Sequence, residues 1–187
     1  MKKYLSVILL AVSVMAVRAE DLTAFTLIKE GDKYVGEQSK DKVVQIRSEK
    51  SVASLVPEVW YVVYYDPTAT LKAMEVKFGA GKMLAVKRPL RLLEPVTGAD
   101  RQMDADKLKT DSDQALAIAK KEPMLDNLQL KATQFWLQHS ETGPVWKIRF
   151  WAAKLSNPNH MADIGDLYVA ADTGQIVRND LHIHSID

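Results

Sequence analysis

The chain has 187 residues, of which 47% are hydrophobic and 26% charged, a composition typical of a globular protein rather than a disordered one. It contains no cysteine, which excludes disulfides, thiolate metal sites, a cysteine nucleophile and the lipid anchor of a lipoprotein. Its 25 basic and 24 acidic side chains nearly balance, and no stretch is strongly basic, which argues against nucleic acid as the main partner.

The first 19 residues have the pattern of a secretory signal peptide. Lys2 and Lys3 form a basic start, residues 5–17 are apolar, and the Val-Arg-Ala sequence at residues 17–19 suits a cleavage site. The apolar run is shorter than the ~20 residues that span a bilayer, so we expect cleavage and no stable membrane insertion afterwards. Cleavage would remove three basic side chains, leaving 22 against 24 acidic ones, a net charge of −2. We therefore expect a periplasmic or secreted protein.

Residues 20–93 are expected to form an N-terminal unit that consists mainly of strands. Its start, residues 22–28, fits either a short helix that ends at Gly31 or a strand. The expected strands, which are apolar runs or alternate with period two, are 43–46, 52–56, 57–67, 71–78 and 83–86. The segment 57–67 is apolar on both faces, so we expect it to be covered on both sides or to carry an interface.

A linker, residues 94–109, contains turn-forming residues and little to bury. The C-terminal unit, 110–187, then begins with a helix, for which Thr110 is the predicted N-cap and Asp113 the acid three residues later. Pro123 cannot continue this helix.

The rest of the C-terminal unit is predicted to be an antiparallel sheet. We expect a strand at 128–137 with a bulge near 133–135, a strand from Pro144 onwards, a loop at 156–165 and a final hairpin at 166–178. In that hairpin Gly174 supplies the positive φ angle that the turn requires.

The two halves of the chain look alike, which suggests an internal repeat. Residues 57–62 align with residues 144–148, each followed by a hairpin; Trp60 and Trp146 lie 86 positions apart, and the turn glycines Gly81 and Gly174 lie 93 apart. Two α+β units in tandem is the simplest interpretation, and chance similarity between two hairpins is the alternative.

The C-terminal half resembles the PepSY family over residues 110–183. The resemblance lies in the capped helix at 112–119, the strand at 145–148, and the strand, Asp-Thr-Gly turn and return strand at 166–177. The N-terminal half matches only in its strands. The resemblance implies an α+β fold of two tandem PepSY-like units, each an antiparallel sheet with a packed helix. It also implies a role in regulating or inhibiting peptidases or in binding other exported proteins, and it supplies no catalytic residues.

The candidate binding residues are Trp151, Lys147 and Arg149. In the strand that begins at Pro144, four apolar side chains between residues 146 and 152 share one face, and these three residues share the other. An indole among basic side chains on a sheet face suits contact with a protein or peptide. The alternative is that the other half of the chain covers this face.

A second interpretation is a small-ligand or metal carrier in the periplasm. His182 and His184 would point the same way in a strand, as in a two-histidine metal site, and His160, Asp163 and Asp166 are the residues available to complete it. Unliganded histidines at an exposed terminus are the simpler explanation, and we expect no metal or cofactor. No hydrolase or nucleotide-binding motif is present, so we predict a non-enzymatic protein and keep an unrecognised hydrolase as a third interpretation.

Overall fold

The structure, a computed structural model of the chain, describes residues 23–89 and 101–183. The predicted signal peptide, His184 and part of the predicted linker lie outside the described residues. No helix in the described part is long and apolar enough to cross a membrane.

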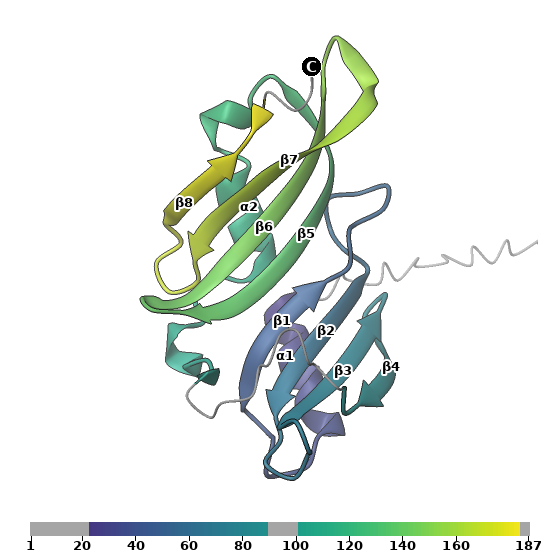
Figure 1. The fold of residues 1–187 in the computed structure, drawn as a ribbon, viewed down its shortest axis with the longest axis vertical. Coiled ribbons are helices and arrows are strands. Elements are labelled where there is room, and N and C mark those ends of the chain that lie inside the picture. The colour runs from purple at the N-terminus through teal and green to yellow at the C-terminus, as the bar shows by residue number, and fades with distance from the viewer. Residues whose placement is uncertain (1–22, 90–100, 184–187) are drawn as a thin grey trace, which may run out of the picture.

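Eight antiparallel strands form one continuous sheet in the order β4-β3-β2-β1-β5-β6-β7-β8 (Figure 1). The strands of the N-terminal half are β1 (Val43–Ser48), β2 (Val59–Tyr65), β3 (Ala73–Gly79) and β4 (Lys82–Lys87). Those of the C-terminal half are β5 (Leu128–Ser140), β6 (Gly143–Lys154), β7 (Asn157–Ala170) and β8 (Ile176–Leu181). The predicted combination of helices with an antiparallel sheet is therefore confirmed.

Two α-helices, α1 (Ala24–Gly31) and α2 (Ser112–Ala119), lie on the same face of the sheet (Figure 1). Of the two possibilities for the start of the chain, the helix that ends at Gly31 is thus the one that forms. Short 3-10 helices occur at η1 (Asp32–Tyr34), η3 (Ala105–Lys107) and η4 (Pro123–Leu125).

The two halves of the sheet meet at β1 and β5, where residues 45–47 pair with residues 136–138. Beyond this short ladder, the hydroxyls of Ser48 and Ser51 accept hydrogen bonds from backbone N–H groups of β5 at 2.9 and 2.8 Å. Serine side chains thus continue the pairing where the backbones diverge, and the halves lie side by side in one sheet.

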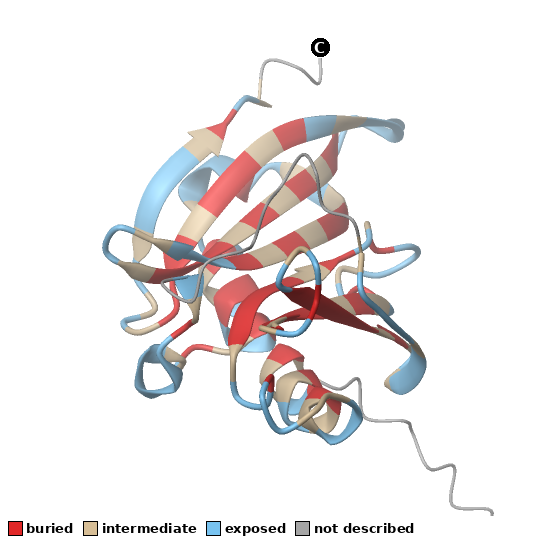
Figure 2. Cartoon of the chain, turned by 60° about the horizontal axis from the view of Figure 1, so that its bottom comes forward, coloured by how far each residue is buried: buried red, intermediate tan, exposed pale blue. Residues whose placement is uncertain are grey.

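A single large core fills the space between the sheet and the helices, with contributions from both halves. Its largest fully buried side chains are Trp146, Tyr64, Phe78, Phe135 and Phe150. The indole N–H of Trp146 donates to the carbonyl of Thr110 at 2.8 Å, and that of Trp60 donates to Pro57 at 2.9 Å. Both polar ends are therefore satisfied inside the core. Figure 2 shows buried residues alternating with half-buried ones along the strands.

One carboxylate caps both helices. The predicted capping box exists one position later than expected, because Asp111 rather than Thr110 is the N-cap of α2 and pairs reciprocally with Gln114. The same carboxylate also accepts the backbone N–H of Phe25 in α1 at 3.1 Å. Asp111 thus meets the positive ends of two helices, where a negative charge is favoured.

Residues 52–56 do not form the predicted strand. They lie in a loop in which Val52 is 75% exposed and Ala53 has a φ angle of +60°. The hydroxyl of Ser51 donates to the carbonyl of Ser54 at 2.7 Å, and this local turn replaces ladder pairing.

The predicted loop at 156–165 is instead the first part of β7. Pro158 is tolerated there because β8 pairs with β7 from Gly165 onwards, so the outer edge of the earlier residues needs no N–H donor. The predicted bulge in β5 exists, but it lies between Leu130 and Ala132, before the expected position.

Candidate binding face of the sheet

The sheet face opposite the helices carries a row of side chains in which cations and aromatic rings alternate. Direct cross-strand pairing aligns one residue from each of seven neighbouring strands, in the order β3, β2, β1, β5, β6, β7 and β8. In spatial order the members are Lys77, Tyr61, Arg47, Trp136, Lys147, Tyr168 and Arg178. We call this set the cation–aromatic row.

Each aromatic ring of the row has a cation over its face. The distances from the cationic group to the ring centroid are 3.9 Å for Arg47 and 5.0 Å for Lys77 over Tyr61, 5.4 Å for Lys147 over Trp136 and 5.1 Å for Arg178 over Tyr168. These distances lie within the ~6 Å range over which a ring attracts a cation. The rings and the cations therefore restrict each other's orientation.

Acidic side chains hold the cations from the other side. The ion pairs join Arg47 to Glu75 at 2.9 Å, Lys77 to Glu49 at 3.2 Å, Lys147 to Asp166 at 3.2 Å and Arg178 to Asp180 at 2.6 Å. Glu49 in addition accepts the hydroxyl of Tyr61 at 2.5 Å, and this bond lowers the pKa of Glu49 below its ordinary value. These ion pairs and hydrogen bonds thus fix the orientation of the side chains in the row in the unbound protein.

Asp166 is a buried acid of this face and holds two of its cations. Its two oxygens accept hydrogen bonds from Arg149 at 2.9 and 3.1 Å, and its side chain also pairs with Lys147. Burial opposes ionisation of Asp166, but the hydrogen bonds from Arg149 and Lys147 outweigh it and bring its pKa below the ordinary value of 3.8. The carboxylate is therefore ionised at neutral pH and keeps both cations in place.

The three predicted binding residues all lie on this face. Lys147 is a member of the row, and Arg149 lies next to it along β6, directly opposite Asp166 on β7. Trp151 lies further along the strand, with the ammonium of Lys50 at 4.2 Å from its ring centroid. Lys50, in the loop after β1, is thus the residue through which the N-terminal half contacts Trp151. The strands of that half lie next to those of the C-terminal half in the same sheet.

Most members of the row were not predicted from the sequence. Each of Tyr61, Trp136 and Tyr168 lies on an alternating strand and is half-buried rather than part of the core. Side-chain exposure is 26% for Arg47 and 25% for Lys147, so the cations also remain accessible. Alternation alone identifies the face of each residue, whereas their alignment depends on the register of strands far apart in the sequence.

The residues considered for a metal site do not converge. His160 and Asp163 lie on β7, and Asp166 is held by Arg149 and Lys147. His184, the second histidine of the predicted pair, lies outside the described residues. Within residues 23–89 and 101–183, no three His, Asp or Glu side chains come together as metal ligands.

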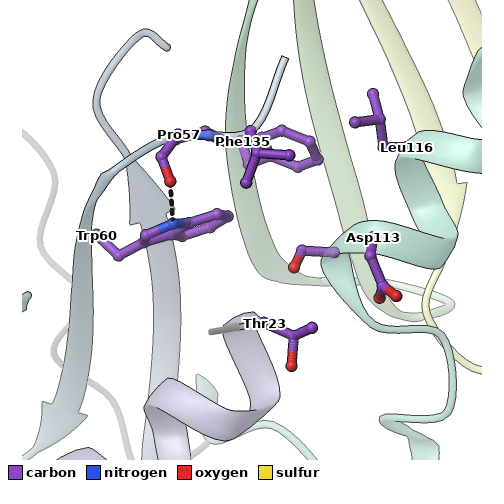
Figure 3. A pocket seen from close by; sticks show the side chains of 8 residues that line it. Thr23, Pro57, Trp60, Asp113, Leu116 and Phe135 are labelled. Atoms are coloured by element: carbon purple, nitrogen blue, oxygen red, sulfur yellow. Dashed lines mark hydrogen bonds between the residues drawn. The ribbon is translucent and has the colours of Figure 1, made fainter. Parts of the chain in front are cut away.

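A hollow on the other face of the sheet lies between the N-terminal ends of the two helices (Figure 3). It contains about 390 Å³ of empty space, part of which is open to solvent. The rings of Trp60 and Phe135, whose centroids are 5.6 Å apart, form part of its wall. Thr23, Ser112 and Asp113 supply its polar groups. Its chemistry suits a small, mainly apolar group.

Comparison of the chain with protein-family models, with curated proteins and with solved structures finds no match.

Proposed function

We propose that this is an exported, non-enzymatic PepSY-like protein that binds another extracytoplasmic protein or peptide through the cation–aromatic row. The alternation of half-exposed tyrosine, tryptophan, arginine and lysine across the sheet carries this proposal. Tryptophan, tyrosine and arginine are the residue types that contribute most to protein interfaces. Because the cation–π contacts and ion pairs already orient them, little side-chain entropy is lost on binding.

The proposal includes two tandem PepSY-like units, at residues 20–93 and 110–187, joined by a linker at 94–109. In support, each half has one α-helix followed by four consecutive antiparallel strands. Trp60 and Trp146 lie on the second strand of their halves, and Gly81 and Gly174 lie in the turns before the fourth. The proposed physiological role is regulation of the bound protein, with inhibition of a peptidase as one form of it.

Export is supported by the basic and apolar residues that precede residue 20. N-terminal sequencing of the extracytoplasmic protein should begin at Glu20. Recovery of the intact N-terminus from the cytoplasm would contradict this part of the proposal.

Affinity capture from the extracytoplasmic fraction tests the binding function. The wild-type protein should retain a defined partner, and Trp136→Ala and Tyr168→Ala should each lose it, since each truncates an aromatic member of the row. Leu155→Ala is the matched control, because Leu155 is 64% exposed and lies in the turn between β6 and β7, away from the row. Retention of the partner by both row variants would contradict the proposal. Capture of single-stranded nucleic acid by the same rings would also contradict it, and salt titration would reveal that mode.

A small-ligand carrier is the second candidate, favoured by the hollow between α1 and α2. If this is the function, an apolar fluorescent probe should bind the intact protein, and Leu116→Trp, which fills the hollow, should abolish that binding while row variants leave it unchanged. Calorimetric titration with zinc tests the metal-carrier form of this idea, and we expect no heat of binding.

A further inference from the structure

The two edge strands of the sheet, β4 and β8, have very different surfaces. The middle of β8 is polar, with Arg178, Asn179 and Asp180 in succession. The middle of β4 is apolar and solvent-exposed: Met83 is 37%, Leu84 57% and Val86 40% exposed. Within the described residues β4 pairs with β3 alone, so one side of its backbone has no strand neighbour. Such an edge is a template for pairing with another chain.

The apolar side chains of β4 lie on both sides of this edge. Cross-strand pairing places Met83 beside Phe78 and Val86 beside Val76, both of which belong to the core on the helix face. Tyr34 extends the same surface, with its ring centroid 6.4 Å from that of Phe78. A strand added to β4 would therefore continue the hydrophobic surface of the core.

Leu84 covers the opposite side of the edge. The register shifts between Lys77 and Phe78, which makes Leu84 the extra residue of a β-bulge. Its side chain packs over Gly79, where an added Cβ atom would lie 2.6 Å from Leu84 Cδ1. Absence of a side chain at residue 79 thus allows Leu84 to lie flat along the strand end.

Lysines at both ends of β4 determine which chain suits this edge. If two copies paired antiparallel over the full strand, Lys82 of each would lie opposite Lys87 of the other, and directly opposed like charges are destabilising. Glu75, which lies opposite Lys87 on β3, already pairs with Arg47. A segment with an apolar middle and acidic residues at both ends would instead neutralise the two lysines.

We propose that β4 binds an extended segment of a different protein by strand addition, and that this segment has acidic residues flanking a short apolar run. Backbone hydrogen bonds to the edge supply affinity, and Met83, Val86 and the two lysines supply specificity. This site is separate from the cation–aromatic row, whose nearest member lies on β3.

Two peptides provide the probes: acetylated Glu-Val-Thr-Val-Thr-Glu and its counterpart Lys-Val-Thr-Val-Thr-Lys, each with a fluorescent label. The intact protein should bind the glutamate peptide about fivefold more tightly, because two cross-strand ion pairs form. Amide hydrogen exchange of residues 82–87 should slow when this peptide is bound, and that of residues 176–181 should not change.

The double variant Lys82→Glu, Lys87→Glu is the sharpest control, since both side chains are exposed and the core is untouched. It should bind the lysine peptide in preference, whereas Val177→Lys on the other edge should leave the wild-type preference intact. Equal affinity for the two peptides, no binding at millimolar concentration, or protection away from residues 82–87 would overturn the proposal. A homodimer in sedimentation that Leu84→Lys dissociates would also overturn it, because a second copy would then be the occupant.

Discussion

Tryptophan has two different roles on the two faces of the sheet. Of the four tryptophans in the chain, Trp60 and Trp146 lie on the helix-covered face and are 4% and 0% exposed. Each donates its indole N–H to a backbone carbonyl. Trp136 and Trp151 lie half-buried on the other face, where the ring of each holds a lysine ammonium, at 5.4 and 4.2 Å.

The difference shows how one residue type serves stability or recognition according to its neighbours. On the covered face the rings pack against other rings, such as Phe25 and Phe135 at 6.2 and 6.0 Å from Trp146. On the other face the rings are oriented by charged partners that remain in contact with solvent. We therefore expect the covered face to account for most of the folding free energy and the other face for most of the binding free energy.

The largest expected effect is that of Trp146→Ala. This change removes a fully buried indole, leaves a cavity and orphans the carbonyl of Thr110, so the free energy of unfolding should fall by about 3–5 kcal/mol. Urea denaturation monitored by circular dichroism measures it. Trp146→Phe, which keeps most of the ring volume, is the control and should cost less. A loss below 1 kcal/mol would contradict the assignment of Trp146 to the core.

The contrast between the faces also explains what the sequence could predict. The apolar face of the strand that begins at Pro144, and the final hairpin around Gly174, whose φ angle is +71°, are both predictable because these inferences use local spacing and turn chemistry. The strand predicted at 52–56 and the loop predicted at 156–165 are wrong, because a left-handed residue at Ala53 and an unpaired outer edge at Pro158 override local propensity.

The cation–aromatic row was beyond prediction for a different reason. Its centre is the pairing of Arg47 with Trp136, which joins strands about half a chain apart. The sequence identified Lys147, Arg149 and Trp151 because they share one strand. It gave no register for β1 against β5, which depends on packing of both halves on a common core and on the Ser48 and Ser51 hydroxyls at the junction.

Asp111→Ala should have the next largest effect on the free energy of unfolding. It changes only the face of the sheet that the helices cover. The carboxylate caps α2 and also accepts the N–H of Phe25 in α1, so its loss should reduce the free energy of unfolding by about 2 kcal/mol, roughly twice the effect of one cap. Asp104→Ala is the matched control, because Asp104 caps only the short helix η3. Binding to the row should be unchanged. Equal, small effects of the two changes would show that α1 does not depend on the shared cap.

Asp166→Asn tests the electrostatic part of the other face. The pKa of Asp166 is lowered in the folded protein, so its ionised form stabilises the fold above pH ~4, and this contribution is lost as the pH falls through the folded pKa. The variant should be about 1.5 kcal/mol less stable at pH 7, and the difference should shrink below pH 4. Denaturation at a series of pH values measures this. A difference that is constant between pH 7 and pH 3 would mean that the carboxylate contributes by packing rather than by charge.

Trp136→Ala and Trp151→Ala should have the smallest effects on stability and the largest on binding. Each change removes a half-buried ring and one cation–π contact, worth about 0.5–1 kcal/mol at such sites, so the midpoint of thermal unfolding should shift little. If this face is the binding surface, each should weaken partner binding by about 2 kcal/mol or more, as truncation of a central aromatic does. Calorimetric titration with the captured partner measures that loss, and Leu155→Ala serves again as the control.

Trp151 provides the clearest test between a structural role and a binding role, because Lys50 of the N-terminal half lies over its ring. If that contact were part of a structural seam between the halves, Trp151→Ala would destabilise the fold about as much as Trp146→Ala. Equal destabilisation by the two changes would therefore contradict a binding role for Trp151 and would still be consistent with the fold described above. A Lys50→Ala variant separates the cases further: it should leave the free energy of unfolding within about 1 kcal/mol of wild type, since it removes a single half-buried cation–π contact. It should also free the Trp151 ring for a partner's cation, so binding of a basic segment would strengthen while binding of an acidic one would weaken.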